Sequence, residues 1–210
     1  MRWFRTLFCG SGADERCIIV GMAGPTAGVL LRDPIDEQTL DRLMSLAFLP
    51  SGTWSGDWYI EDPAALGMPA ELAQAGAVGV GLRQPSGLPA LTEALGFTPP
   101  LEIAVWMWCN QDVDHRMLGY LCLAFAIQYD GLVDFYGRIN TPPSGFVVTG
   151  MNERQRRAEL DSEIARRVRR LPGRLYLVNY GSRTNPRYSH IGDAVFTEGW
   201  LRHPRFRMIK

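Results

Sequence analysis

The sequence predicts a single α+β domain over residues 1–210, in which helices pack on a mostly antiparallel sheet. Three observations predict this class. The chain has 210 residues, 46% of them hydrophobic and 21% charged, as one soluble core requires. Residues 101–108 alternate like a strand that is largely apolar on both faces, so we expect both faces to be covered. A capped helix and a second strand follow directly, over residues 112–136.

The N-terminal part predicts a strand and a helix. Residues 17–22 are typical of a buried strand, and residues 23–28 of an irregular connection that leads to a short apolar run. From Asp36, apolar residues recur at helical spacing around Leu40, and we expect Pro50 to stop this helix.

The middle of the chain predicts an antiparallel meander. Residues 54–62 resemble a turn that feeds a short strand, and residues 77–83 a strand weakened by two glycines. Between them, residues 63–75 predict one or two helical turns. A short helix over residues 88–95 is expected to end at Gly96.

In the C-terminal half, Asp112 or Asp114 can cap the central helix, which we expect Asp130 and Gly131 to end. Residues 144–171 predict a charged surface helical insertion. Asp193 can cap a last helix, and residues 206–209 predict an edge strand. The expected sheet strands contain Cys17, Tyr59, Val78, Ile103, Val133 and Tyr176, and the helices around Leu40 and Leu121 pack on them.

Composition excludes several function classes. Lys+Arg and Asp+Glu number 22 each, so no net field attracts nucleic acid or an anionic membrane. The four cysteines form no CxxC pair, which favours a reduced, cytosolic protein. No run reaches the ~18 to 20 apolar residues of a membrane span, and the N-terminus lacks the pattern of a signal peptide.

One cluster of chemically versatile residues follows the strand that ends near Trp108. A hydrolase could use this cluster, with Cys109 as the nucleophile, His115 as the base and Asp112 or Asp114 as the carboxylate that orients the base. The simpler interpretation is structural: an aspartate caps the helix, and the apolar run buries Cys109.

Other motifs have equally plain interpretations. His115, His190 and His203 with Asp193 or Asp114 could form a metal site, but their spacing matches no metal motif, so we expect structural roles and no metal or cofactor. The glycines at 21–24 and 79–81 complete no phosphate-binding motif. The arginine-rich segment around residues 154–170 could contact RNA phosphates, yet interspersed acids favour a solvated helix.

Aromatic and acidic side chains gather in the predicted turn at residues 54–62. This composition is typical of a protein-binding patch that could take a basic partner. Trp58 and Ile60 could equally be the inward positions of a strand. The candidate partner-binding residues are Trp54, Asp57, Trp58, Glu61 and Asp62.

Several segments resemble a family of small uncharacterised bacterial proteins whose members look like immunity proteins of polymorphic or secretion-system toxins. The resemblance covers mainly residues 101–135 and 175–210, with residues 144–171 as a variable insertion. It rests on Gly24-Pro25-Thr26, Cys109-Asn110, His115-Arg116, Leu118-Gly119, the run at 130–135 and the ending at 188–193 and 200–210.

The resemblance implies a cytoplasmic, non-enzymatic inhibitor that binds a cognate toxin domain and occludes its active site. Two alternatives stay open: a hydrolase or toxin-reversing enzyme that uses His115 with Asp114 or Cys109, and a phosphate- or RNA-binding module that uses the arginine-rich helix. The resemblance transfers no catalytic residues to this chain.

Overall fold

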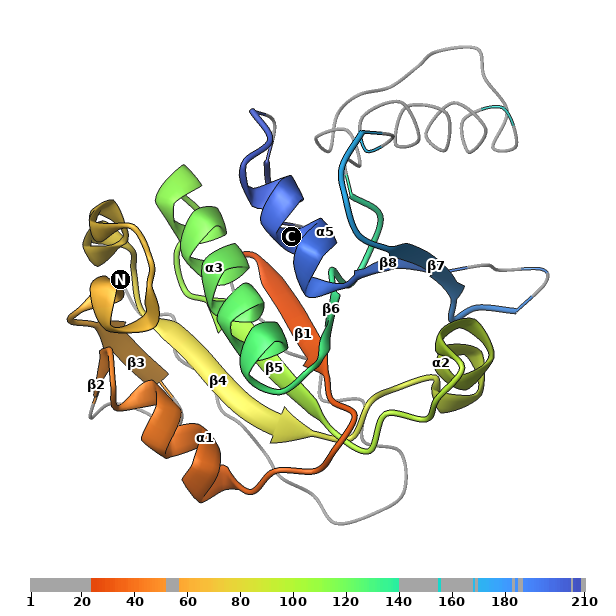
Figure 1. The fold of residues 1–210 in the computed structure, drawn as a ribbon, viewed down its shortest axis with the longest axis horizontal. Helices are drawn as coiled ribbons and strands as arrows, with labels where there is room; N and C mark the ends of the chain where they lie inside the picture. Colours follow the sequence, from red (N-terminus) through yellow and green to blue (C-terminus); the bar gives the residue numbers. More distant parts are fainter. Residues whose placement is uncertain are drawn as a thin grey trace, which may run out of the picture.

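The computed structural model describes residues 24–51, 57–139, 155, 168, 170–182, 184, 187–204 and 206–208. Within them, eight strands form one sheet in the order β2-β3-β4-β5-β1-β6-β8-β7, and each neighbouring pair is antiparallel (Figure 1). The predicted α+β class with an antiparallel sheet is confirmed. The strands are β1 (Thr26–Leu30), β2 (Phe48–Pro50), β3 (Asp57–Ile60), β4 (Val78–Arg83), β5 (Glu102–Met107), β6 (Leu132–Asp134), β7 (Leu175–Asn179) and β8 (Tyr188–Gly192).

The helices begin close to the predicted positions. Asp36 caps α1 by accepting a hydrogen bond from Thr39 N at 2.7 Å, and Asp193 caps α5 by accepting one from Phe196 N at 2.7 Å. The predicted turns at residues 63–75 are two short 3-10 helices. The elements are α1 (Glu37–Met44), η1 (Pro63–Leu66), η2 (Ala70–Gln74), α2 (Leu88–Leu95), α3 (Asp112–Gln128) and α5 (Ala194–Leu201).

Several predictions about the strands were wrong. Residues 26–28 belong to β1 and not to an irregular connection, because they pair with β5 on one side and reach β6 on the other. Pro50 does not stop a helix: α1 ends at Met44, and Pro50 closes β2, a short edge strand that tolerates its missing N–H. Strand β8 was not predicted, since its polar residues 188–190 hide the alternation.

The C-terminal segment also departs from the prediction. Residues 206–208 form no strand; the Phe206 ring lies 6.2 Å from that of Trp200, and Met208 is buried in the core. After α3, Asp130 adopts the left-handed backbone conformation, with φ 47°, while Gly131 does not. The predicted strand at residues 17–22 and almost all of the insertion at 144–171 lie outside the described residues.

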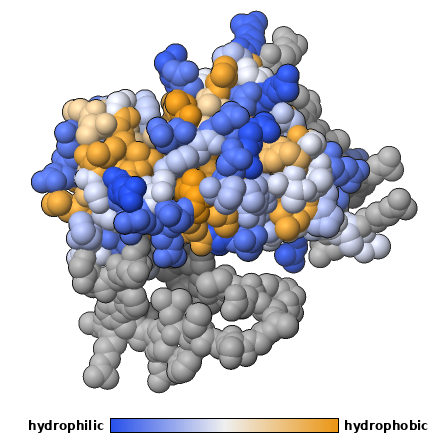
Figure 2. All heavy atoms as spheres, turned by 60° about the horizontal axis from the view of Figure 1, so that its bottom comes forward, coloured by the Kyte–Doolittle hydropathy of each residue, from blue (hydrophilic) through white to orange (hydrophobic). Residues whose placement is uncertain are grey.

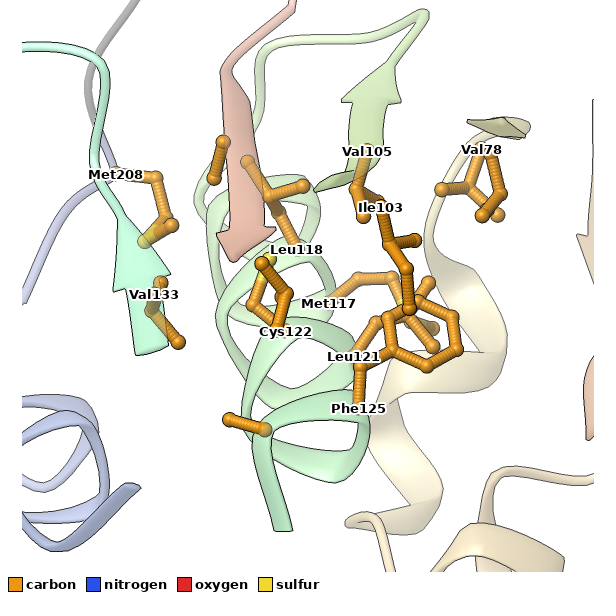
Figure 3. Close-up of a cluster of buried hydrophobic side chains, with 14 of the residues drawn as sticks. Val78, Ile103, Val105, Met117, Leu118, Leu121, Cys122, Phe125, Val133 and Met208 are labelled. Carbon is orange, nitrogen blue, oxygen red and sulfur yellow. The ribbon is translucent and has the colours of Figure 1, made fainter. Parts of the chain in front are cut away.

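Helix α3 organises the main core (Figure 3). It connects β5 to β6, which run parallel to each other because both are antiparallel to β1. In the close-up, Met117, Leu121 and Phe125 point from α3 toward Ile103 of β5. Full burial of such side chains contributes about 1.5–3 kcal/mol each. Gly119, on α3, leaves room for Leu201 and Phe206, so α5 and the C-terminal segment lie close to α3.

The two faces of the sheet carry different side chains. Alternate residues face α3, as Val29, Ile103 and Val133 do, and form the main core. The residues between them face the opposite side, where α2 covers only part of the sheet over a second, smaller core. The candidate site lies on this second face. In the described part of the chain, no helix has the length and apolarity needed to cross a lipid bilayer.

Candidate functional site

The polar cluster after Trp108 serves the start of α3. Asp114 Oδ2 accepts a hydrogen bond from Gln111 N at 2.7 Å, and its Oδ1 accepts one from Gly76 N at 2.8 Å. Both oxygens of this carboxylate therefore bind backbone amides, in a capping box that also ties η2 to α3. The N-cap residue is Gln111 and not an aspartate, but Asp114, at the third helical position, accepts from the Gln111 amide, so one of the two predicted aspartates does bind an amide at the start of the helix.

His115 and Cys109 do not complete a catalytic chain with Asp114 in the described contacts. His115 is buried, and its Nε2 lies 3.1 Å from Asn110 Oδ1. Burial lowers the pKa of His115, and the charge of Arg207 lowers it further. Cys109 is exposed, so the expectation that the apolar run buries it was wrong: β5 ends at Met107, before this residue.

Replacing Asp114 by alanine should destabilise the fold by about 2–4 kcal/mol, because two amides in a part-buried position lose their acceptor. Replacing the exposed neighbour Asp112 by alanine is the matched control and should cost less than about 1 kcal/mol. Urea denaturation of both variants measures the difference, and equal losses would contradict the cap assignment.

The three histidines each have a separate partner. His190 Nδ1 accepts a hydrogen bond from Ile139 N at 3.0 Å, and burial lowers the pKa of His190 to about 4. His203 stacks on Trp200, with ring centroids 4.9 Å apart. Among the described residues, no three His, Cys, Asp or Glu side chains gather as a metal site would require. Gly79 and Gly81 lie within β4, so they form no phosphate loop.

The predicted partner-binding residues separate into three groups. Trp54 lies outside the described residues. Asp57 and Trp58 are buried, and Trp58 belongs to the main core. Desolvation raises the pKa of Asp57, although a hydrogen bond from Trp108 opposes this shift. Glu61 and Asp62 are exposed. The alternation therefore places Trp58 inward, as the strand interpretation of this segment expected.

Next to these residues, large apolar side chains are exposed on the second face of the sheet. Leu49 of β2 pairs with Tyr59 of β3, and their side chains are 51% and 52% exposed. Asp57, Trp106 and Trp108 share this face, because Asp57 and Trp106 both pair with Gly79. Trp108 is 40% exposed. We call Leu49, Tyr59, Glu61, Asp62 and Trp108 the β2–β3 surface.

A network of buried carboxylates and tyrosines lies farther along the same face, and sequence reasoning missed it. Glu102 of β5 accepts hydrogen bonds from Arg83 Nε at 2.8 Å and from the Tyr136 hydroxyl at 2.5 Å. Asp134 of β6 accepts hydrogen bonds from the Tyr180 hydroxyl at 2.6 Å, the Ser189 hydroxyl at 2.5 Å and Tyr136 N at 2.8 Å.

Burial and backbone conformation mark this network as unusual. Desolvation raises the pKa of Asp134 to about 6, against the lowering effect of its three donors. Desolvation also raises the pKa of Tyr136. Tyr136 has φ 54°, a left-handed conformation that costs a bulky residue on the order of 1–3 kcal/mol. Strain of this kind together with a carboxyl group of perturbed pKa in a pocket is typical of functional sites.

A glycine in the central strand makes room for the network. Gly28 of β1 lies between Glu102 and Tyr136, and a Cβ atom at this position would overlap both side chains. The signal in the sequence is faint: Glu102 interrupts an apolar strand, and Asp134 does the same in the next. No local pattern pairs them, because they meet only across β1.

Comparison with known proteins identifies the family. The model of a family of unknown function, DUF6368, matches residues 23–210. The chain belongs to this family. The sequence analysis also expected an uncharacterised family, and the match agrees with that part of the expectation. No curated protein and no solved structure matches the chain.

Proposed function

We propose that this DUF6368 chain is a protein-binding inhibitor that docks a basic protein domain on its β2–β3 surface. The observation that carries the proposal is the exposure of three large apolar side chains, Leu49, Tyr59 and Trp108, on one face at one end of the sheet. Binding energy at protein interfaces concentrates in a few such anchors, among which tryptophan and tyrosine are enriched.

Two exposed carboxylates beside these anchors, Glu61 and Asp62, and an acidic stretch of the chain around them in sequence favour a basic partner. Between residues 33 and 82 the chain has eight acidic residues and one basic residue, Arg42, although its net charge is zero. Glu61 and Asp62 lie beside the apolar side chains, and both of their amides donate to Ala47 O, at 2.8 and 3.1 Å. Such a surface attracts a positively charged partner and speeds its association. The acidic residues are Asp33, Asp36, Glu37, Asp41, Asp57, Glu61, Asp62 and Glu71.

The form of the sheet edge favours docking through side chains. Strand β2 has only three residues, and Pro50 supplies no backbone N–H to an added strand. Figure 2 shows groups of hydrophobic residues among hydrophilic ones on the surface of the described part of the molecule. A preformed surface of this kind binds with little loss of backbone freedom.

The family resemblance of the sequence adds the biological role: the partner is a toxin domain encoded beside this chain, and binding occludes its active site in the cytoplasm. A toxin that acts on nucleic acid has the basic surface that this acidic end would complement. The proposal keeps Glu61 and Asp62 from the predicted contacts and adds Leu49, Tyr59 and Trp108.

The test measures binding of the neighbouring gene's toxin domain to the full chain by biolayer interferometry, together with growth protection in cells that express that domain. Tyr59→Ala should weaken binding by about tenfold to 100-fold, since a central anchor is lost. Glu61→Lys should slow association and reduce its dependence on salt.

Val195→Ala is the matched control, because Val195 is also 52% exposed but belongs to α5. It should change affinity by less than about threefold. Melting temperatures confirm that each variant is folded. The proposal fails if the chain does not bind the domain, or if Tyr59→Ala and Val195→Ala bind it equally well.

A further inference from the structure

The carboxylate network opens into a pocket that the proposed docking role does not use. The pocket has a volume of about 230 Å³, and Arg83, Glu102, Asp134, Tyr136, Tyr180 and Ser189 contribute to its walls. Leu30 and Leu91 add an apolar side. One water molecule takes up about 30 Å³, so the pocket has room for on the order of seven waters. An occupant of this size is smaller than a drug-sized ligand.

The two carboxylates in the pocket wall accept fewer hydrogen bonds from the protein than they can. A carboxylate offers about four acceptor positions. In the described contacts Asp134 uses three of them, for Tyr136 N, Tyr180 and Ser189, and Glu102 uses two, for Arg83 and Tyr136. About one position on Asp134 and two on Glu102 therefore remain for an occupant.

The hydroxyl groups beside these carboxylates have no donor to spare. Tyr136, Tyr180 and Ser189 each have one hydroxyl proton, and each donates it to Glu102 or Asp134. Other side-chain donors of the lining include the guanidinium groups of Arg83 and Arg187, which are both exposed. Around the buried carboxylates the wall therefore offers acceptors, and this inner part matches an occupant that supplies several donors.

Charge points to the same class of occupant. The lining has two carboxylates, Glu102 and Asp134, and two guanidinium groups, Arg83 and the exposed Arg187. Glu102 forms an ion pair with Arg83, at 2.8 Å. The hydrogen bonds to Asp134 come from two hydroxyls and an amide, all of them neutral. Above its pKa Asp134 adds a buried negative charge, which a bound cation would stabilise.

We propose that this pocket binds a small organic cation, an amidinium, guanidinium or primary ammonium compound, which donates hydrogen bonds to Glu102 and Asp134. A planar amidinium can donate two parallel hydrogen bonds to one carboxylate, which gives the site orientation as well as affinity. The apolar side formed by Leu30 and Leu91 contacts the uncharged part of the ligand.

Three molecules of nearly equal shape test the charge requirement: benzamidine is a cation, benzamide is neutral and benzoate is an anion. Each is titrated into the full chain at pH 7.5 and followed by two-dimensional NMR and calorimetry. Benzamidine should bind at least tenfold more tightly than benzamide, with shifts at Tyr136 and Tyr180, and benzoate should not bind. Equal binding of benzamidine and benzamide, tighter binding of benzoate or no saturable binding of benzamidine overturns the proposal.

Variants locate the binding site. Glu102→Gln keeps the shape and removes the charge, so it should weaken benzamidine binding at least tenfold, whereas Glu93→Gln, on the exposed side of α2, should not. Because Glu102→Gln can impair folding, Ser86→Phe provides a second test: Ser86 is exposed and lines the pocket, and the ring should block it without loss of melting temperature. Unchanged benzamidine binding by folded Ser86→Phe overturns the proposal.

Discussion

Replacing Gly28 by alanine is expected to lower the free energy of unfolding by about 2–4 kcal/mol. The new Cβ atom would overlap the carboxylate of Glu102 and the hydroxyl of Tyr136. These groups cannot move freely, because Arg83 binds both, at 2.8 Å to Glu102 and 2.6 Å to Tyr136. The substitution must therefore separate a buried carboxylate from its donors or displace strand β1.

Gly81→Ala is the matched control for this prediction. Gly81 lies on the same face of the sheet, in β4, but its added Cβ would meet only Trp106, at 3.9 Å. Alanine also restricts the unfolded chain more than glycine does, so this variant should change stability by less than about 1 kcal/mol. Urea denaturation of both variants measures the difference. A loss in Gly28→Ala no larger than in Gly81→Ala would contradict the geometry of the network.

Two buried groups should give the chain opposite responses to pH. The pKa of Asp134 rises from 3.8 to about 6, so its contribution to stability is present in acid and is lost as the pH rises toward 6. The pKa of His190 falls from 6.5 to about 4, so its contribution is present above pH 6.5 and is lost as the pH falls toward 4. Each shift corresponds to about 3 kcal/mol, and the two nearly cancel between pH 4 and 6.

Substituting either group should expose the other. Asp134→Asn removes the group that stabilises the fold in acid. Between pH 7 and pH 4 this variant should therefore lose about 3 kcal/mol more of its free energy of unfolding than the wild type does. His190→Asn keeps an acceptor near Ile139 N and removes the titration, so the acid loss should shrink by a similar amount.

Denaturant unfolding of the wild type and both variants at pH 4, 5, 6 and 7 measures these slopes. Other titrating groups affect all three proteins alike, so the comparison isolates Asp134 and His190. Ser189, Tyr180, Tyr136 and Glu102 surround Asp134, and the charge of Arg138 acts on His190. Parallel pH profiles for the two variants would contradict the assignment.

The sequence predicted most elements whose cause is local. Alternation placed Trp58 inward and Tyr59 outward in β3, and the helix signals placed the caps at Asp36 and Asp193. These features depend on residues three or four positions apart, or on the period of two along a strand. The strands with weak local signals, β2 and β8, were missed, because they are stabilised by pairing with β3, β6 and β7.

The candidate site could not be predicted in the same way. Glu102 and Tyr136 are 34 residues apart, and Asp134 and Ser189 are 55 apart. They meet because β5, β1, β6 and β8 are consecutive in the sheet, an order that no local pattern encodes. The role of Gly28 could not be predicted either, because its lack of a side chain matters only once Glu102 and Tyr136 pack against it.

By itself, then, the sequence determined the α+β class, the apolar periodicities and the helix caps, because each follows from contacts between near neighbours in the chain. Only the tertiary structure decided which polar residues share a site. Sheet order brought Arg83, Glu102 and Asp134 to one pocket, and the same face left Leu49, Tyr59 and Trp108 exposed at its end. The physical reason is that burial and charge act between residues that pack together, however far apart they lie in the chain.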